Sequence, residues 1–185
     1  MPLLTEYTSF ADAQTHCSKE RLWELFDGSR DSINIAHECI DRHPRDRVAV
    51  RIALAAGGSE SITFGELSDW AGRYANYLRA QGIGPGERVA LMVEPSLPFY
   101  VALYGAMKAG CVAVPLFTLF GPDGLRLRVG DCQPKLLLLA PEKADLAADA
   151  GCNVAIADDD FMAMLENHET AFETTTTGRD MAMFQ

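Results

Sequence analysis

The segment "LMVEPSLPFYVALYGAMKAGCVAVPLF", residues 91–117, decides the fold because it reads as a strand, a helix and a second strand. Ser96 stands where a helix cap belongs, and Gly110 stands where the helix should end. The apolar residues between them recur at helical spacing, as on an inward face: Leu97, Val101, Tyr104 and Met107. The flanking apolar runs are typical of parallel strands covered on both faces. Because the segment offers no obvious nucleophile, metal cluster or base, we expect it to have a structural role, with Tyr104 and Met107 in the hydrophobic core.

Upstream of this segment, the sequence predicts a hairpin and a long helix. "RVAVRIAL" (47–54) alternates with the period of a half-exposed strand, and Gly57-Gly58 turns the chain toward a second strand. Thr63 and Glu66 form a capping-box pattern. The apolar side chains that follow share one helix face: Leu67, Trp70, Ala71, Tyr74, Ala75 and Leu78. "GIGPGE" (82–87) precedes a strand, which favours a turn over a dinucleotide-binding fingerprint.

The remaining segments continue the alternation of strands and helices. Helices are expected over 32–42, 122–132, 142–150 and 161–167, and strands at "RVALMV", "KLLLLA" and "NVAIA". Parallel strands need such crossovers. We therefore predict an α/β layered fold with a mainly parallel sheet, flanking helices and an N-terminal hairpin. Residues 1–30 are expected to form an N-terminal arm, and 31–185 one partial domain.

The amino-acid composition limits which partners the protein can bind and in which cellular compartment it is expected. The chain has 185 residues and a net charge of -10, a sign that repels nucleic acids and anionic membranes. It shows neither a signal peptide nor an apolar run of the roughly 18 residues that a membrane span needs. Its five cysteines are odd in number and lack a C-x-x-C pair, so reduced, buried thiols are expected. These features predict a cytoplasmic protein that binds no nucleic acid and has no membrane span.

Several clusters invite a ligand-binding interpretation. His37 and Asp41 have the i, i+4 spacing of two metal ligands, but no third ligand is evident, so a solvated surface helix is favoured. The run Asp158, Asp159, Asp160 can cap a helix or attract magnesium, and the cap is favoured. "TTTTGR" (174–179) is rich in hydroxyls, yet no apolar helix follows it, which favours a mobile loop.

The cations allow only a weak anion hypothesis. Lys108 lies on an otherwise apolar helix, where it can reach the surface or meet a phosphate, and the surface is favoured. Positive charge also gathers between residues 122 and 145, at Arg126, Arg128, Lys135 and Lys143. By themselves these residues support a fold class and define no active site.

Three stretches taken together resemble the N-terminal part of the adenylate-forming enzymes, in the acetyl-CoA and medium-chain acyl-CoA synthetase branch. Residues 61–117, from "SITFGELSDW" to "KAGCVAVPLF", are similar to the family's threonine-started helix, its Gly-x-x-x-Gly-[DE]-Arg-Val strand and its Lys-Ala-Gly-x-Val-x-Val-Pro-Leu strand. "NIAHECIDRH" (34–43) and "LRLRVGDCQPKLLLL" (125–139) resemble the flanking family segments. The resemblance covers roughly residues 33–160 and is specific as a set.

This resemblance implies an ATP-dependent acid-CoA ligase. In such enzymes a carboxylate attacks the α-phosphate of ATP, and the CoA thiol then displaces AMP from the acyl-adenylate. It implies ATP, Mg²⁺ and CoA as cofactors and a carboxylic acid as substrate, in fatty acid metabolism. In some CoA ligases basic side chains after the "KLLLL"-type strand approach the CoA nucleotide phosphate, and Lys143 is the nearest match. No catalytic or metal-binding residue is assigned.

The resemblance also implies parts that correspond to no position in this sequence. The family's phosphate loop is expected immediately after "MAMFQ", and its ribose-binding aspartate, hinge and catalytic lysine lie further on. We therefore expect an N-terminal fragment of a ligase that is inactive alone, binds no cofactor tightly and self-associates through exposed apolar surface. Two alternatives stay open: a self-contained nucleotide- or CoA-binding module that uses its strand ends, and a non-catalytic interaction protein.

Overall fold

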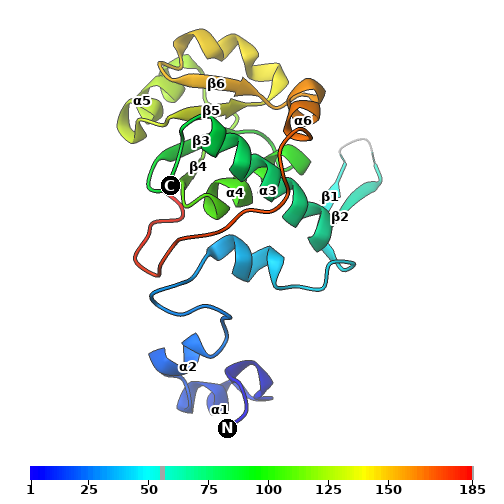
Figure 1. Ribbon diagram of the computed structural model, residues 1–185, viewed down its shortest axis with the longest axis vertical. Helices are drawn as coiled ribbons and strands as arrows, with labels where there is room; N and C mark the ends of the chain where they lie inside the picture. Colours follow the sequence, from blue (N-terminus) through cyan, green and yellow to red (C-terminus); the bar gives the residue numbers. More distant parts are fainter. Residues whose placement is uncertain (55–56, 185) are drawn as a thin grey trace.

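The computed structural model describes residues 1–54 and 57–184. Within them, a parallel sheet in the order β4-β3-β5-β6 forms the centre, and an antiparallel pair, β1-β2, projects from its side (Figure 1). The strands are β1 (Val48–Ala53), β2 (Ser59–Thr63), β3 (Arg88–Met92), β4 (Val112–Pro115), β5 (Leu136–Leu139) and β6 (Asn153–Ile156). The helices are α1 (Phe10–Thr15), α2 (Lys19–Trp23), α3 (Phe64–Ala80), α4 (Leu97–Lys108), α5 (Pro122–Cys132) and α6 (Asp159–Leu165). Shorter 3-10 or π turns are η1 (Leu4–Glu6), η2 (His37–Asp41) and η3 (Pro141–Asp149).

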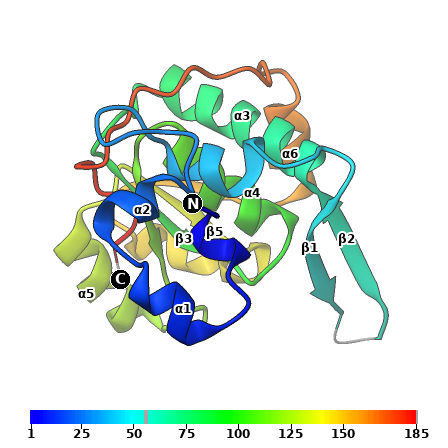
Figure 2. The same cartoon turned by 90° about the horizontal axis from the view of Figure 1, so that it is seen from below.

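Helices cover both faces of the central sheet, which confirms the predicted α/β layers (Figures 1 and 2). Side chains alternate along each strand, so Val89 and Leu91 pack toward α3, α4 and α6, whereas Ala90 and Met92 pack toward α5 and η3. In the sheet, β4 lies on one side of β3 and β5 lies on the other. The connection from β3 to β4 therefore crosses the sheet in one direction, and the connection from β4 to β5 crosses it in the other. Right-handed crossovers then place α4 and α5 on opposite faces.

The capping box at the start of α3 forms as the sequence predicts. The Thr63 hydroxyl accepts a hydrogen bond from the Glu66 amide at 3.2 Å, and the Glu66 carboxylate accepts one from the Thr63 amide at 2.8 Å. Further along, α3 packs closely on α4. A Cβ at Gly105 would lie 2.8 Å from Tyr74, so glycine is what lets the two helices approach.

The quoted strand-helix-strand unit is also as predicted, with two corrections. Ser96 occupies the N-cap position of α4, but its hydroxyl donates to the Glu94 carbonyl at 2.9 Å and caps no helix amide. Met107 is buried, whereas Tyr104 is only partly buried at the edge of the core. The hydrophobic spacing therefore identified the inward side of α4 without telling how deep each residue lies.

Three further expectations need correction. The helix predicted over 142–150 is the 3-10 turn η3, and the one over 32–42 ends in the π turn η2, where the Arg42 amide donates to the His37 carbonyl at 3.1 Å. Cys17 and Cys39 are exposed, while Cys111 and Cys132 are buried, so the prediction of buried thiols was wrong for the first two. None of the five cysteines is in a disulfide.

The hairpin is confirmed, and Ile62 of β2 is the residue through which it enters the core. Gly57 and Gly58 have φ angles of 93° and 88°, which L side chains rarely adopt, and the Leu54 amide donates to the Gly58 carbonyl at 3.1 Å. The start of the predicted turn at residues 55–56 lies outside the described residues. Because only the base of the hairpin meets α3, every apolar residue of β1 stays partly exposed.

A long irregular segment, residues 166–181, crosses the outside of α3 and α4 and is called the strap below (Figure 1). The side chain of Asn76 on α3 donates to the Glu169 carbonyl at 2.7 Å and to the Ala171 carbonyl at 2.9 Å. Arg73 donates to the His168 carbonyl at 2.9 Å. The strap is thus held by side chains of α3 although it has no regular secondary structure.

After the strap, the chain joins the open edge of the central sheet. Met183 bridges to Ala113 of β4 in parallel, and the Phe184 amide donates to the Ala113 carbonyl at 3.0 Å. Residues 182–184 therefore run in the same direction as the four central strands. None of the helices in the described residues combines the length and the apolar character that spanning a bilayer requires.

Candidate functional site

The carboxyl ends of the central strands meet at one edge of the sheet, called the carboxyl edge below. All neighbouring pairs in the central sheet are parallel, so every strand ends there. In open α/β sheets, ligands bind outside this edge, where neighbouring strands send their connections to opposite faces. Here β3 continues into α4 and β5 into η3, which lie on opposite faces. The loops after β3 and β5 therefore mark the candidate functional site.

Two polar side chains are joined at this edge. Thr118, in the loop after β4, is buried and donates a hydrogen bond to the carboxylate of Glu94, in the loop after β3. Glu94 itself is exposed. The contact fixes the two loops relative to each other.

Lys143, the residue that the resemblance singled out, lies in the first turn of η3, directly after β5. Its amide donates to the Ala140 carbonyl at 2.9 Å, and the Ala140 amide donates to the Met92 carbonyl at the end of β3 at 3.0 Å. The fold therefore places Lys143 beside the carboxyl ends of β3 and β5, where the two strands send their connections to opposite faces. Its side chain is half-buried and, within the described residues, enters no hydrogen bond or ion pair.

The surroundings of Lys143 limit how much negative charge it can balance. Glu142 and Asp145 flank it in η3, and both are exposed. A phosphate monoester carries a charge of about -1.5 to -2 near pH 7. One lysine between two carboxylates can supply one contact to such a group, and other cations must supply the rest.

The structure does not bring the other cations of the 122–145 region to this site. Arg128 lies over the ring of Phe120, 3.6 Å from its centroid, and donates to the Gly124 carbonyl. Arg126 and Lys135 line a pocket of about 450 Å³ at the opposite edge of the sheet, where the strands begin. Arg126 pairs with Asp123 at 3.0 Å and Lys135 with Glu87 at 3.7 Å. The four cations therefore do not form a single anion site.

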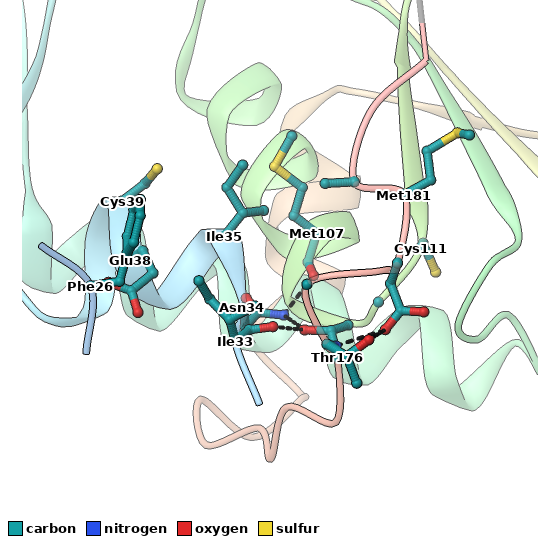
Figure 3. A pocket seen from close by; sticks show the side chains of 15 residues that line it. Phe26, Ile33, Asn34, Ile35, Glu38, Cys39, Met107, Cys111, Thr176 and Met181 are labelled. Atoms are coloured by element: carbon teal, nitrogen blue, oxygen red, sulfur yellow. Dashed lines mark hydrogen bonds between the residues drawn. The ribbon is translucent and has the colours of Figure 1, made fainter. Parts of the chain in front are cut away.

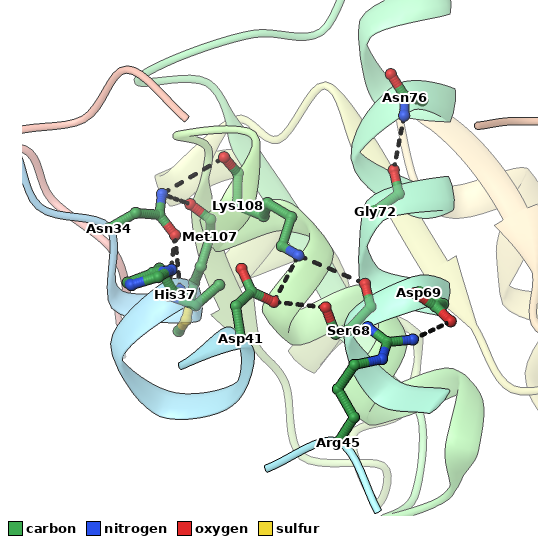
Figure 4. Close-up of polar contacts among 11 residues, drawn as sticks. Asn34, His37, Asp41, Arg45, Ser68, Asp69, Gly72, Asn76, Met107 and Lys108 are labelled. Atoms are coloured by element: carbon green, nitrogen blue, oxygen red, sulfur yellow. Dashed lines mark hydrogen bonds and ion pairs between the residues drawn. The ribbon is translucent and has the colours of Figure 1, made fainter. Parts of the chain in front are cut away.

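Lys108 does not reach the surface, so the favoured interpretation of it was wrong. Its side chain is 5% exposed, and its ammonium group lies 2.8 Å from Oδ1 of Asp41 (Figure 4). The same carboxylate oxygen accepts a hydrogen bond from the Ser68 hydroxyl at 2.7 Å. This buried ion pair ties η2 to α3 and α4, which is a structural role.

The other candidate clusters are structural as well. His37 points to Asp27, with 3.2 Å between Nε2 and Oδ2, so it does not share a ligand with Asp41. The Asp158 side chain caps α6 by accepting from the Phe161 amide at 2.8 Å, as favoured from the sequence. In residues 1–54 and 57–184, no group of three or more His, Cys, Asp or Glu side chains could hold a metal ion.

The hydroxyl-rich segment 174–179 is a loop, but one that hydrogen bonds hold in place. The Thr176 hydroxyl donates to the Ile33 carbonyl at 2.5 Å, and the Ile33 amide donates to the Thr176 carbonyl at 3.0 Å. Thr177 binds Asp180 through its amide at 2.7 Å and through its hydroxyl. These threonines are therefore used by the chain itself.

Burial works against a nucleophilic role for four of the five cysteines. Burial raises the pKa of Cys39, Cys132 and Cys152, and it raises the pKa of Cys111 to about 12. A raised thiol pKa keeps the group protonated, whereas a nucleophile needs the thiolate. Burial also raises the pKa of Tyr74 well above its usual range.

Sequence reasoning missed the role of Asn34. Its buried amide group donates to the Met107 carbonyl at 2.9 Å (Figure 4) and to the Thr176 hydroxyl at 3.0 Å (Figure 3). Its Oδ1 accepts from the Ala36 amide. An asparagine just before a helical pattern is a recognisable cap signal. Its two distant partners have no signal in the local sequence.

Comparison with known proteins agrees with this architecture. The family model described as AMP-binding enzyme matches residues 36–183. Acetyl-coenzyme A synthetase from Bradyrhizobium diazoefficiens is 34% identical over 136 residues, which make up 68% of this chain and 21% of that protein. The crystal structure of a Brucella canis acyl-CoA synthetase superposes with a TM-score of 0.86 and 28% identity over 96% of this chain and 35% of that chain.

A second solved structure, ATP-bound MatB from Rhodopseudomonas palustris, has a TM-score of 0.67 and 29% identity, covering 81% of this chain and 31% of that one. The chain thus spans about a fifth of the length of the curated relative and about a third of the solved structures.

Proposed function

Because the chain belongs to the AMP-binding enzyme family, we propose that it supplies the first sheet of an ATP-dependent carboxylic acid-CoA ligase. The single observation that carries this proposal is the family match over residues 36–183, on a fold with the order β4-β3-β5-β6. The Bradyrhizobium relative is an acetyl-coenzyme A synthetase, and the MatB structure is bound to ATP. An acid, CoA, ATP and Mg²⁺ are therefore the proposed substrates and cofactors, and the cytoplasm the proposed location.

The carboxyl edge is the side of the sheet where we place this chemistry. Both the loop after β3, with Glu94, and the loop after β5, with Lys143, reach it. Residues 182–184 run parallel to β4 and so head toward the same edge. A carboxylate becomes reactive once it is joined to AMP, since AMP is then the leaving group. This chain's own residues serve that reaction by holding loops and by offering one cation.

Lys143 is proposed to contact a phosphate of CoA. Its half-buried side chain beside the carboxyl ends of β3 and β5 supports this role, and so does the absence of a competing hydrogen bond or ion pair within the described residues. The flanking carboxylates of η3 mean that Lys143 supplies one contact among several. The domain division at residues 30 and 31 likewise remains a prediction.

ATP-pyrophosphate exchange with a panel of carboxylic acids tests the proposed function, using the polypeptide encoded by the whole reading frame that contains these residues. We expect acid-dependent exchange, followed by acyl-CoA formation when CoA is added. Exchange with no acid in the panel, and no acyl-CoA formation, would refute the proposal.

Residues 1–185 alone are proposed to be inactive, because the curated relative is about five times longer than the segment they match. We expect no exchange and, by calorimetry, no saturable micromolar binding of ATP, AMP or CoA. Micromolar binding would favour a self-contained nucleotide- or CoA-binding module. Self-association through exposed apolar residues such as Phe117 and Leu119 is also proposed, and a strictly monomeric chain in light scattering at high concentration would contradict it.

Lys143→Glu in the whole enzyme tests the CoA contact. Reversing one charge should raise the KM for CoA roughly tenfold, since an ion pair near a protein surface is worth on the order of 1 kcal/mol or more. ATP-pyrophosphate exchange should not change, because CoA takes no part in it. Lys19→Glu, on the exposed face of α2, is the matched control. An unchanged KM for CoA would remove Lys143 from the site.

A further inference from the structure

A cavity of about 340 Å³ lies between four segments that are distant in sequence (Figure 3). Phe26 of the N-terminal region, the stretch around Ile33 and Ile35, the end of α4 at Met107, and the strap with Met181 contribute its walls. The volume is at the low end of the roughly 300–1,000 Å³ that small-molecule sites occupy. The lining is mostly apolar, with two methionines whose flexible side chains can adapt to a ligand.

The frame of this cavity is held rigidly by hydrogen bonds. Asn34 bridges the Met107 carbonyl and the Thr176 hydroxyl, and Thr176 in turn binds the backbone of Ile33 through two hydrogen bonds (Figure 3). The Gly178 amide donates to the Arg30 carbonyl at 2.8 Å. The cavity is therefore a product of the tertiary structure.

The polar groups of the lining are already satisfied and carry the wrong charge for an anion. The carboxylate of Glu38 accepts from the amides of Asp27 and Gly28 and pairs with Arg42 at 2.6 Å. Asp180 accepts from Thr177. Among the residues that the structure describes, the lining contains these two carboxylates and no lysine or arginine. A ligand would gain apolar contacts there, whereas a buried negative charge would lose its hydration with no cation of the lining to offset the loss.

We propose that this cavity binds a small, uncharged, apolar molecule, at a site separate from the carboxyl edge. Gly110 and Cys111 line the cavity and directly precede β4, so it lies near the edge where the strands begin. Lys143 follows the end of β5, at the opposite edge. The ligand is therefore neither the carboxylate substrate nor CoA, both of which are anions.

Two fluorescent probes with one ring skeleton test the charge preference. N-phenyl-1-naphthylamine is neutral, and 8-anilinonaphthalene-1-sulfonate adds a sulfonate. The neutral probe should bind saturably, one per chain, and the sulfonate at least about tenfold more weakly, because no cation of the lining offsets the hydration that a buried sulfonate loses. No saturable binding of the neutral probe, or equal affinity of both probes, would overturn the proposal.

Ala182→Phe tests the location by filling the cavity, which the Ala182 side chain lines. The same substitution at Ala163, an exposed residue of α6 outside the cavity, is the control. Ala182→Phe should abolish binding of the neutral probe, and Ala163→Phe should keep the parent affinity. Undiminished binding to a folded Ala182→Phe chain, shown to be folded by circular dichroism, would refute the assignment.

A measurement on the parent chain covers the case in which Ala182→Phe does not fold. Cys39 lines the cavity and is exposed, and Cys17 is exposed but lies outside it. Saturating neutral probe should slow alkylation of Cys39 by N-ethylmaleimide several-fold and leave Cys17 unaffected, as followed by peptide mass spectrometry. Equal rates at Cys39 with and without the probe would count against the site.

Discussion

Replacing Gly72 by alanine should loosen the strap, because the strap passes directly over this glycine. A Cβ at Gly72 would lie 1.8 Å from the carbonyl oxygen of Thr170 and 2.8 Å from its carbonyl carbon. Both atoms are backbone, so no side-chain rotation relieves the clash. To reach ordinary contact the carbonyl must retreat by roughly 1.6 Å, more than a hydrogen bond tolerates.

The cost follows from the hydrogen bonds on either side of that carbonyl. Asn76 donates to the carbonyls of Glu169 and Ala171, the two neighbours of Thr170. Each neutral hydrogen bond contributes about 0.5–1.5 kcal/mol net, and leaving a buried amide unsatisfied costs about 1–3 kcal/mol. Alanine regains up to about 1 kcal/mol of helix propensity. The net loss is about 2 kcal/mol, or about 4–8 °C in Tm for a chain of this size.

Thermal unfolding and hydrogen exchange measure this effect. Gly130→Ala in α5 is the matched control, because it is exposed and a Cβ there meets nothing within 4 Å. It should leave Tm unchanged or raise it. In Gly72→Ala, amide exchange should speed up at Ile33, whose amide donates to the strap at Thr176, and stay slow in β3. A Gly72→Ala chain as stable as the Gly130→Ala chain would refute the reasoning.

Three further perturbations follow from the same contacts. Lys108→Met should lower the unfolding free energy by about 2–3 kcal/mol in urea titrations, less than for a fully buried pair because the Asp41 side chain is 22% exposed. Adding Asp41→Leu removes the unpaired carboxylate and should recover part of this loss. A double variant that recovers none of it would argue against the ion pair. Hydrogen bonds from Thr63 lower the pKa of Glu66, so the ionised carboxylate stabilises the fold above the unfolded-state pKa, and this stabilisation disappears as the pH falls through the lower folded-state pKa. The difference in unfolding free energy between the parent and Glu66→Gln should therefore vanish below about pH 4. A difference that grows in acid would contradict the reasoning. With its pKa raised to about 12 by burial, Cys111 should be alkylated far more slowly at pH 8 than exposed Cys17, and comparable rates by mass spectrometry would contradict that burial.

Local patterns were enough to predict most of the fold. The capping box of Thr63 and Glu66 and the continuous apolar runs of β3 and β5 are readable because each depends on residues within one element. Sheet order is not local, since a parallel strand can pair on either side of its neighbour. The π turn at η2 and the 3-10 turn at η3 were not predicted either, because helical spacing of apolar residues does not distinguish them from an α-helix.

The candidate site was less predictable, for a physical reason that Lys108 illustrates. From its own helix it reads as a surface lysine, but its partner Asp41 lies 67 residues earlier. Gly72 likewise reads as an ordinary helical glycine until Thr170 is placed over it. Lys143 was selected only through the family resemblance. Its place beside the carboxyl ends of β3 and β5 depends on strand order, which no local pattern contains.

The contacts of the buried polar side chains show which of them have a structural role and which lie at the candidate functional site. Asn34, Asn76 and Lys108 each bind segments far away in the sequence, and all three are spent on holding η2, α4 and the strap in place. At the carboxyl edge, Thr118 is the buried polar side chain among the described residues, and it holds the loop of Glu94. Rigid elements thus carry loops whose exposed groups remain available for ligands. Changes in the first three should therefore alter activity only through stability, whereas Lys143→Glu should alter the KM for CoA at unchanged stability.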